Sequence, residues 1–268
     1  MADGENRGTG RVTGETEGAI GWVIFDRPER HNAISYEMWM ALPEVLAAHE
    51  ADPQVKAIVL RGAGERAFIS GADISQFDKR RASAAANETY RSVGEAAFSA
   101  LRDTPKPTIA MIRGYCIGGG LAVALCCDLR IAAEDAQLAI PAARLGLGYA
   151  FDGVTRLADV VGPAYAKEIL FTARRFDAAE AWRMGLVNRV VATEALLEET
   201  LGAAAAIAEN APLTIAAAKR AINEAMLPPD ERDLAAVAAA IERCFDSDDF
   251  AEGRKAFAEK RQPVFKGR

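Results

Sequence analysis

Short apolar strands alternate with helical segments through the first half of this 268-residue chain. Strands are predicted at 19–25, 56–61 and 107–112, where β-branched and aromatic residues gather. The second of these strands ends at a turn, the Gly-Ala-Gly sequence of 62–64. Because strand, turn and helix follow one another repeatedly, the sequence predicts an α/β fold.

Helix signals mark both halves of the chain. A helix is predicted from Ser35, which can cap its first turn, and His49 near its end is expected at the surface. A second helix is predicted over 177–185, with an aspartate cap and a glycine stop. From Thr193 onward the chain is helical and alanine-rich. Such amphipathic helices bury apolar stripes against other subunits or against their own domain, and both readings stay open.

Composition excludes several classes of function. Half of the residues are hydrophobic, 26% are charged and the formal net charge is -6, which predicts a globular chain without an electrostatic footprint for nucleic acid. The first ten residues are expected to be flexible. No apolar run suggests a signal peptide or a membrane span, so a cytoplasmic protein is expected.

The metal-binding and thiol residues are few. Four cysteines without CxxC spacing are expected to be buried thiols in a reducing compartment. Two histidines exclude a three-histidine metal site, and no metal is expected.

Three consecutive glycines, Gly118 to Gly120, precede an almost unbroken apolar segment. An ordered glycine costs conformational entropy, so the run indicates a place where a side chain would interfere. One reading is close approach of the backbone to an anionic ligand at a helix N-terminus, and the other is tight packing of helix against sheet. The chain lacks the Walker pattern of phosphate-binding loops.

Five motifs in order carry a family resemblance. They are DRPERHNAI at 26–34, AFISGADI at 67–74, GYCIGGG at 114–120 with CD at 127–128, FDAAEA at 176–181 with GLVN at 185–188, and EGRKAF at 252–257 with EKR at 259–261. Over about residues 15–265 the chain resembles the enoyl-CoA hydratase/isomerase, or crotonase, superfamily.

The resemblance implies a fold, a substrate class and an assembly. It implies a crotonase-like spiral of repeated ββα units over 11–200, after a flexible N-terminus at 1–10. A C-terminal helical region at 201–268 is implied to form homotrimers or dimers of trimers. The implied substrate is an acyl-CoA thioester, with coenzyme A as part of the substrate and no cofactor bound permanently.

The resemblance also identifies the anion. In this superfamily two backbone N–H groups bind the thioester oxygen and stabilise an enolate, and they fall here on Ala72 and Gly119. Donors fixed in place before the reaction stabilise developing charge without reorganisation. Asp73 is expected to cap a backbone N–H.

Coenzyme A contacts follow from the same resemblance. They are implied for Arg27, Asn32 and Ala33, for Ala72, Asp73 and Ile74, and for Phe257 and Lys260 of a neighbouring subunit. The charges of Arg27 and Lys260 suit the phosphates of the coenzyme, and both also fit ordinary surface positions.

The chain departs from the hydratase pattern at both catalytic glutamates. Ala122 and Ala142 stand at those positions, and alanine cannot act as a general base. Candidate replacements follow at 144–152. Tyr149 is either a proton donor or a wall of the site, Asp152 is either an acid/base or a helix cap, and Arg144 could pair with a substrate carboxylate.

Three functions remain open at this point. The first is a hydratase/isomerase-type enzyme in which Asp152, or a carboxylate of the 76–91 segment, moves the proton. The second is a decarboxylase of a malonyl-type CoA ester, because the 145–149 and 167–172 segments look like part of the methylmalonyl-CoA decarboxylases. The third is an acyl-CoA-binding protein without catalysis.

Overall fold

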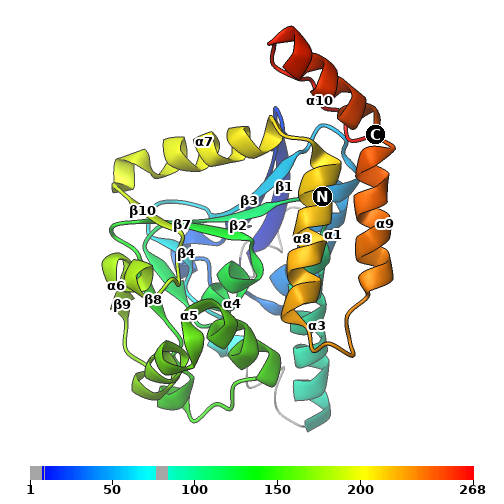
Figure 1. Cartoon of the computed structure of the whole chain (residues 1–268). Coiled ribbons are helices and arrows are strands. Elements are labelled where there is room, and N and C mark those ends of the chain that lie inside the picture. Colours follow the sequence, from blue (N-terminus) through cyan, green and yellow to red (C-terminus); the bar gives the residue numbers. More distant parts are fainter. Residues whose placement is uncertain (1–7, 9, 77–83) are drawn as a thin grey trace, which may run out of the picture.

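Two β-sheets form the centre of the protein in the computed structural model, which describes residue 8, residues 10–76 and residues 84–268 (Figure 1). Most of the predicted flexible N-terminus, residues 1–7 and 9, lies outside the described residues. The same holds for 77–83 within the 76–91 segment that was expected to supply a carboxylate.

The large sheet has six strands and the small sheet has four. The large sheet runs in the order β1 (Arg11–Glu17), β2 (Ile20–Asp26), β3 (Ala57–Gly62), β5 (Thr108–Ile112), β7 (Leu129–Ala133) and β10 (Arg189–Val191). The small sheet runs in the order β4 (Ala67–Ile69), β6 (Tyr115–Ile117), β8 (Gln137–Ala139) and β9 (Phe176–Asp177). All neighbours are parallel except the β1–β2 hairpin and the β8–β9 pair.

A three-element unit repeats along the chain. Its first strand joins the large sheet, its second strand joins the small sheet, and a helix follows. The units are β3 and β4 with α3 (Ala84–Asp103), β5 and β6 with α4 (Gly119–Cys126), and β7 and β8 with α5 (Phe151–Thr172). This is a spiral of ββα units, so the predicted fold class is confirmed.

Both faces of the large sheet are covered, which explains its apolar strands. Val23 and Phe25 of β2 pack on the side of α1 (Tyr36–Ala51). Trp22 and Ile24 point to the other side, where α7 (Leu196–Ala208) lies across the sheet (Figure 1). A strand buried on both faces cannot alternate polar with apolar residues, and six of the seven residues of β2 are buried.

The helix predicted from Ser35 is α1, and the hydroxyl of Ser35 accepts a hydrogen bond from Met38 N at 3.2 Å. The surface position expected for His49 is wrong, because this side chain is only 4% exposed. Its Nε2 lies 2.9 Å from the carbonyl oxygen of Trp22. The ring fits over Gly14 and Gly21 of the β1–β2 hairpin, where a side chain would leave no room.

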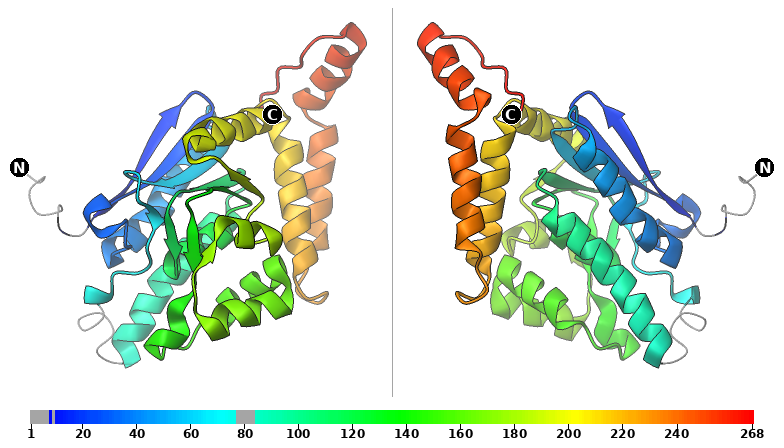
Figure 2. Two further views of the ribbon diagram at one scale, coloured as in Figure 1. Left: turned by 90° about the vertical axis from the view of Figure 1, so that its left-hand side faces the viewer. Right: turned by 90° about the vertical axis from the view of Figure 1, so that its right-hand side faces the viewer.

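The C-terminal helices lie progressively farther from the sheets. The predicted boundary at residue 200 falls inside α7, which still packs on the large sheet. The helices α8 (Pro212–Met226) and α9 (Leu234–Phe245) then form a hairpin, and α10 (Asp248–Glu259) projects beyond it (Figure 2). In the described chain, no helix taken singly is long and apolar enough to cross a membrane; residues Thr193–Ala208 and Pro212–Met226 meet that test only as a pair bent by 104°.

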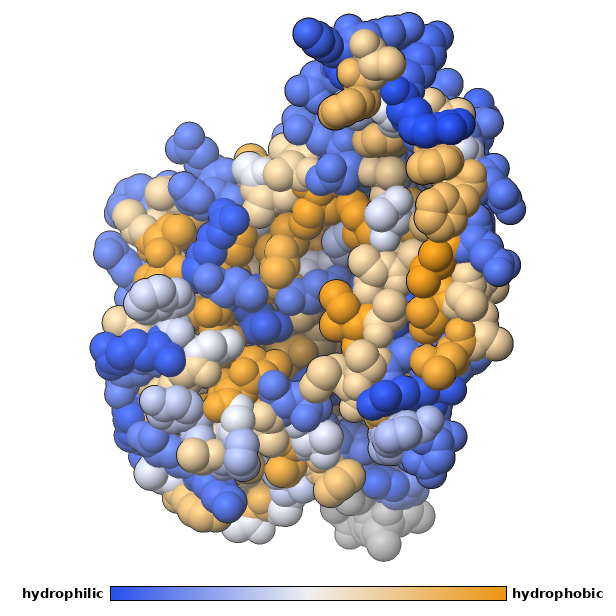
Figure 3. Space-filling view, viewed as in Figure 1, coloured by the Kyte–Doolittle hydropathy of each residue, from blue (hydrophilic) through white to orange (hydrophobic). Residues whose placement is uncertain are grey.

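Apolar side chains remain exposed on these last helices. Figure 3 shows apolar surface along α8 and α9. The exposed set includes Ile222, Met226, Leu234, Ile241, Phe245 and Phe257. An exposed apolar band of this kind is typical of a surface that contacts another protein chain.

Candidate active site

The glycine run forms the turn into α4, and its members serve different purposes. Gly118 is the N-cap residue with φ 54° and ψ −113°, a conformation that favours glycine. A side chain at Gly120 would collide with the carbonyl oxygen of Ile69. Gly119 has no such neighbour, since a methyl group there would make only ordinary contacts at 3.4 Å and beyond. Packing and backbone geometry therefore explain Gly118 and Gly120 and leave Gly119 for another role.

The N–H of Ala72 is directed toward this turn. Ala72 forms a parallel bridge with Ile34, in which Gly71 O accepts from Ile34 N at 2.8 Å and Ile34 O accepts from Asp73 N at 2.8 Å. In a parallel bridge the central residue turns its own N–H away from that partner. A methyl group at Gly119 would lie 3.6 Å from Ala72 N, so the backbones of Ala72 and Gly119 meet on this side.

The N–H of Gly119 is free for a ligand because of its place in the helix. The first hydrogen bond within α4 runs from Ala122 N to Gly118 O at 3.0 Å, so the N–H groups before it have no partner inside the helix. Ala72 and Gly119 are both partly exposed. The two residues chosen from the sequence thus lie side by side at the turn into α4.

Asp73 fixes the loop that carries Ala72. Its Oδ1 accepts hydrogen bonds from Ser75 N at 3.0 Å and Ser75 Oγ at 2.7 Å, which confirms the predicted capping role. Its Oδ2 accepts from Arg27 Nη1 at 2.7 Å. Burial alone would raise the pKa of Asp73, but the hydrogen bonds from Ser75 and Arg27 outweigh it, so the pKa lies below its ordinary value.

Buried side chains fix the loop that follows β2 and carries the first predicted coenzyme A contacts. Arg27 is 6% exposed and its guanidinium also donates to Gly8 O at 2.8 Å, so it is not a free surface charge. The side chain of Asn32 is fully buried and donates to Ala63 O and Ala67 O, both at 2.9 Å. The backbone is engaged as well, since Arg27 N donates to Asn32 Oδ1 at 3.0 Å and Asn32 N donates to Arg27 O at 2.9 Å. Contacts of Arg27, Asn32 and Ala33 with coenzyme A stay predictions.

One face of α4 continues from the N–H pair. Gly119, Ala122 and Cys126 follow one another at helical spacing of three and four residues, so they share that face. Ala122 is 8% exposed. Ala142 lies in the short 3-10 helix Pro141–Leu145, whose first residue would be 4.0 Å from a methyl group at Gly118. Neither alanine position supplies an acid or a base beside the N–H pair.

Tyr149 lies near the far end of this face, together with an arginine that the sequence reasoning missed. Arg156 Nη1 lies 3.2 Å from Cys126 Sγ. Burial raises the pKa of Tyr149 to about 12; the nearby thiol of Cys126 adds to the rise and Arg156 opposes it. Tyr149 is therefore a phenol that keeps its proton at neutral pH. No signal in the sequence identified Arg156, because its partner Cys126 lies 30 residues earlier, on α4.

The other two candidates of this segment face solvent. Asp152 lies in the first turn of α5 and is exposed, and Ala150 is the N-cap residue, so the helix-cap role predicted for Asp152 is wrong. The reason is that the helix begins at Phe151, two positions earlier than a cap at Asp152 would place it. Arg144 is exposed in the 3-10 helix. Their roles in acid/base chemistry and carboxylate binding stay predictions.

The remaining coenzyme A candidates are all accessible. Ile74 is 64% exposed beside Ala72. Phe257 is 87% exposed on α10, and the exposed Lys260 ends that helix. Figure 2 shows α10 at the tip of the molecule, away from the sheets, as the predicted role in a neighbouring subunit requires.

The thiols and acids of the described chain do not form a metal site. In that part, no group of three or more His, Cys, Asp or Glu side chains could hold a metal ion. All four cysteines are free, and three are buried. Burial raises the pKa of Cys126 to about 11 and also raises the pKa of Cys116 and of Cys127.

Comparison with known proteins agrees with the geometry. The family model described as Enoyl-CoA hydratase/isomerase matches residues 15–268. The chain is 36% identical over 251 residues to a crotonyl-CoA hydratase of Syntrophomonas wolfei, covering 94% of this chain and 96% of that protein. It is 37% identical over 257 residues to a carnitinyl-CoA dehydratase of Citrobacter koseri, covering 94% and 96%.

Solved structures match over the same length. The crystal structure of an enoyl-CoA hydratase/carnithine racemase from Magnetospirillum magneticum has a TM-score of 0.90 and 38% identity, and each chain is covered to 96%. A family model spanning nearly the whole chain, enzymes of similar sequence and a shared fold lead to one conclusion. The chain belongs to the enoyl-CoA hydratase/isomerase family and is an enzyme that acts on an acyl-CoA.

Proposed function

We propose that this enzyme stabilises the enolate of an acyl-CoA thioester between the N–H groups of Ala72 and Gly119. The meeting of these two backbones carries the proposal, because Gly119 is the one glycine of its run that neither packing nor helix geometry requires. Each donor of such a pair contributes about 3–4 kcal/mol of transition-state stabilisation.

The reaction that creates the enolate depends on which group handles the proton. Water addition needs a general base, and Ala122 and Ala142 provide none. Asp152, the carboxylate that the sequence put forward, is exposed to solvent. A hydratase/isomerase-type reaction therefore requires Asp152, or an acid of the 76–91 segment, to handle the proton.

Decarboxylation of a malonyl-type ester needs less from the protein. The bond between the α carbon and the carboxylate breaks, carbon dioxide leaves, and the electron pair becomes the enolate held by the two N–H groups. A proton must then reach the α carbon. Tyr149 favours this second reading because its phenol carries a proton at neutral pH and can donate it, and its oxygen recovers the proton from water afterwards.

One experiment separates the two reactions. Purified protein is incubated with crotonyl-CoA and, in parallel, with methylmalonyl-CoA, and the masses of the CoA esters are measured by mass spectrometry. Gain of water on crotonyl-CoA that Asp152→Asn abolishes supports hydration. Loss of carbon dioxide from methylmalonyl-CoA that Tyr149→Phe lowers supports decarboxylation. Unchanged masses for both esters would contradict both reactions.

We also propose that the chain forms a homotrimer or a dimer of trimers in the cytoplasm. The exposed apolar band on α8 and α9 and the projecting α10 support assembly, and the free cysteines suit a reducing compartment. Light scattering is expected to give three or six times the chain mass of 28.6 kDa. A monomer would also contradict the roles proposed for Phe257 and Lys260 of a neighbour.

A further inference from the structure

Trp39 on α1 carries a hydrogen-bond donor without a partner beside the proposed oxyanion site. Its side chain is 4% exposed, and within the described chain Nε1 has no hydrogen-bond partner. A buried donor left unpaired destabilises the fold, so each case calls for an explanation. The other two tryptophans need none, since Trp22 Nε1 donates to Glu17 Oε2 at 3.2 Å and Trp182 is 60% exposed.

The indole of Trp39 lies against Gly119. A methyl group at Gly119 would be 3.4 Å from Cζ2 of Trp39 and 3.6 Å from the nitrogen of Ala72. Cζ2 and Nε1 are bonded to the same ring carbon, so the N–H belongs to the edge of the indole that approaches Gly119. Two backbone donors and one side-chain donor thus lie around a single α carbon.

Phe98 accounts for the orientation of the indole but not fully for the donor. The rings of Trp39 and Phe98 meet edge to face, with centroids 5.1 Å apart and planes at 69°. An N–H directed at an aromatic face makes a weaker interaction than a hydrogen bond to oxygen, so it does not fully offset the cost of leaving the donor unpaired.

We propose that the Nε1–H of Trp39 binds an oxygen on the α or β carbon of the acyl group. The substrate is then an acyl-CoA with a hydroxyl, oxo or carboxyl oxygen at that place, and Trp39 is a specificity-determining residue. This inference rests on the proposed function, because it requires the thioester oxygen to accept from Ala72 and Gly119. An oxygen on the α or β carbon is separated from the thioester oxygen by only a few bonds. The edge of the indole lies equally close to Gly119, since a methyl group there would be 3.4 Å from Cζ2.

The two alanines strengthen the argument. Ala122 shares the face of α4 that carries Gly119, and the side chains of Ala122 and Ala142 offer a substrate oxygen neither a hydrogen-bond acceptor nor a donor. The donor of Trp39 is therefore left for the substrate itself. A site built to hydrogen-bond a substrate oxygen rejects the analogue that lacks it, because the buried donor then stays unpaired.

The test compares two CoA esters that neither add water nor lose carbon dioxide. Acetoacetyl-CoA carries a β oxygen and butyryl-CoA does not. Calorimetry is expected to show that Trp39→Phe weakens acetoacetyl-CoA binding about tenfold and butyryl-CoA binding less than twofold, since one hydrogen bond of about 1.4 kcal/mol is lost. In ¹⁵N-labelled protein, the indole signal absent from Trp39→Phe is expected to move with acetoacetyl-CoA and to stay in place with butyryl-CoA.

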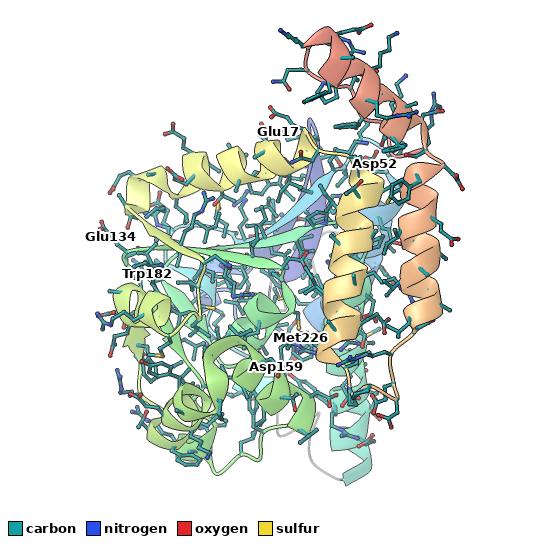
Figure 4. All side chains as sticks on the ribbon, in the orientation of Figure 1. Glu17, Asp52, Glu134, Asp159, Trp182 and Met226 are labelled. Atoms are coloured by element: carbon teal, nitrogen blue, oxygen red, sulfur yellow. The ribbon has the colours of Figure 1, made fainter. Side chains whose placement is uncertain are left out.

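The control is Trp182→Phe on α6 (Ala178–Arg183), and Figure 4 shows Trp182 on the side of the molecule away from α8 and α9. This variant is expected to bind both esters as the wild type does. Equal losses for both esters in Trp39→Phe, or an indole signal that ignores acetoacetyl-CoA, would overturn the inference while leaving the proposed function standing. If the wild type binds neither ester, the proposed function fails and the inference fails with it.

Discussion

Both ends of α4 have backbone groups without partners inside the helix, and the protein treats the two ends differently. At the N-terminus, the N–H of Gly119 has no partner within the helix and is partly exposed. At the C-terminus, the buried guanidinium of Arg130 donates to Cys127 O at 2.8 Å and to Ala124 O at 3.5 Å. The protein thus satisfies the terminal carbonyls itself and leaves a terminal donor open. The difference indicates which end serves stability and which end serves a ligand.

The largest effect is expected on stability, at the C-terminus of α4, which we call the closed end because Arg130 satisfies its carbonyls; the N-terminus with Gly119 is the open end. Arg130→Met removes these bonds and a third, from Nε to Leu186 O at 2.9 Å, and leaves buried carbonyls unpaired. The free energy of unfolding, measured in urea, is expected to fall by about 3–5 kcal/mol. Arg183→Met on the exposed face of α6 is the control, with a change within about 0.5 kcal/mol. Similar values for the two variants would remove the contrast between the ends of α4.

The next effect is expected at the open end, on turnover rather than stability. Gly119→Pro deletes one N–H at the first helical position, where proline is tolerated. Turnover of the acyl-CoA ester identified by mass spectrometry is expected to fall about 10²- to 10³-fold. Circular dichroism is expected to show a folded protein.

A matched variant at the same position isolates the donor. Gly119→Ala keeps the N–H and adds a methyl group that meets Trp39 at 3.4 Å, an ordinary contact. Its turnover is expected to stay within about tenfold of the wild type, because the oxyanion donors are intact. Equal losses for proline and alanine would mean that space, rather than the N–H, is what Gly119 provides.

The smallest effect concerns the loop that holds Ala72 at the open end. Because the folded pKa of Asp73 is lowered from the ordinary value of 3.8, the carboxylate stabilises the fold above that pH. This contribution is lost as the pH falls through the folded pKa. Asp73→Asn is expected to unfold more easily by about 1–2 kcal/mol at pH 7. The gap between variant and wild type should narrow below about pH 4, and a gap that is constant with pH would exclude the ion pair as its cause.

Local patterns in the sequence predicted most of the spiral. The strands β2 and β3 and the capped helix α1 follow from apolar runs and a serine cap, which depend on neighbours in the chain. The meeting of Ala72 and Gly119 was predicted through the motifs that surround them. β1 was missed because its sequence, RVTGETE, is mostly polar, as suits an edge strand with one buried residue.

Contacts between distant elements could not be predicted in this way. His49 is buried because glycines of a hairpin some 30 residues earlier leave space for its ring. Trp39 and Arg156 matter through partners on α4, and no local signal identifies a helical tryptophan or arginine as part of a site. The helix start that misled the interpretation of Asp152 also depends on its packing, since Tyr149 lies against Gly153 of the first turn.

The buried thiols allow the rate at which β6 and α4 separate from their neighbours to be measured in the native protein. Cys126 and Cys127 lie at the end of α4 and Cys116 lies in β6, and a reagent reaches them only when those elements separate from their neighbours. Cys244 on α9 is partly exposed, so its modification does not require the sheets to open. Alkylation followed by mass spectrometry therefore gives two rates of modification from one sample. The fast rate, at Cys244, reports on α9, and the slow rate, at Cys126, reports on α4, the helix that carries Gly119.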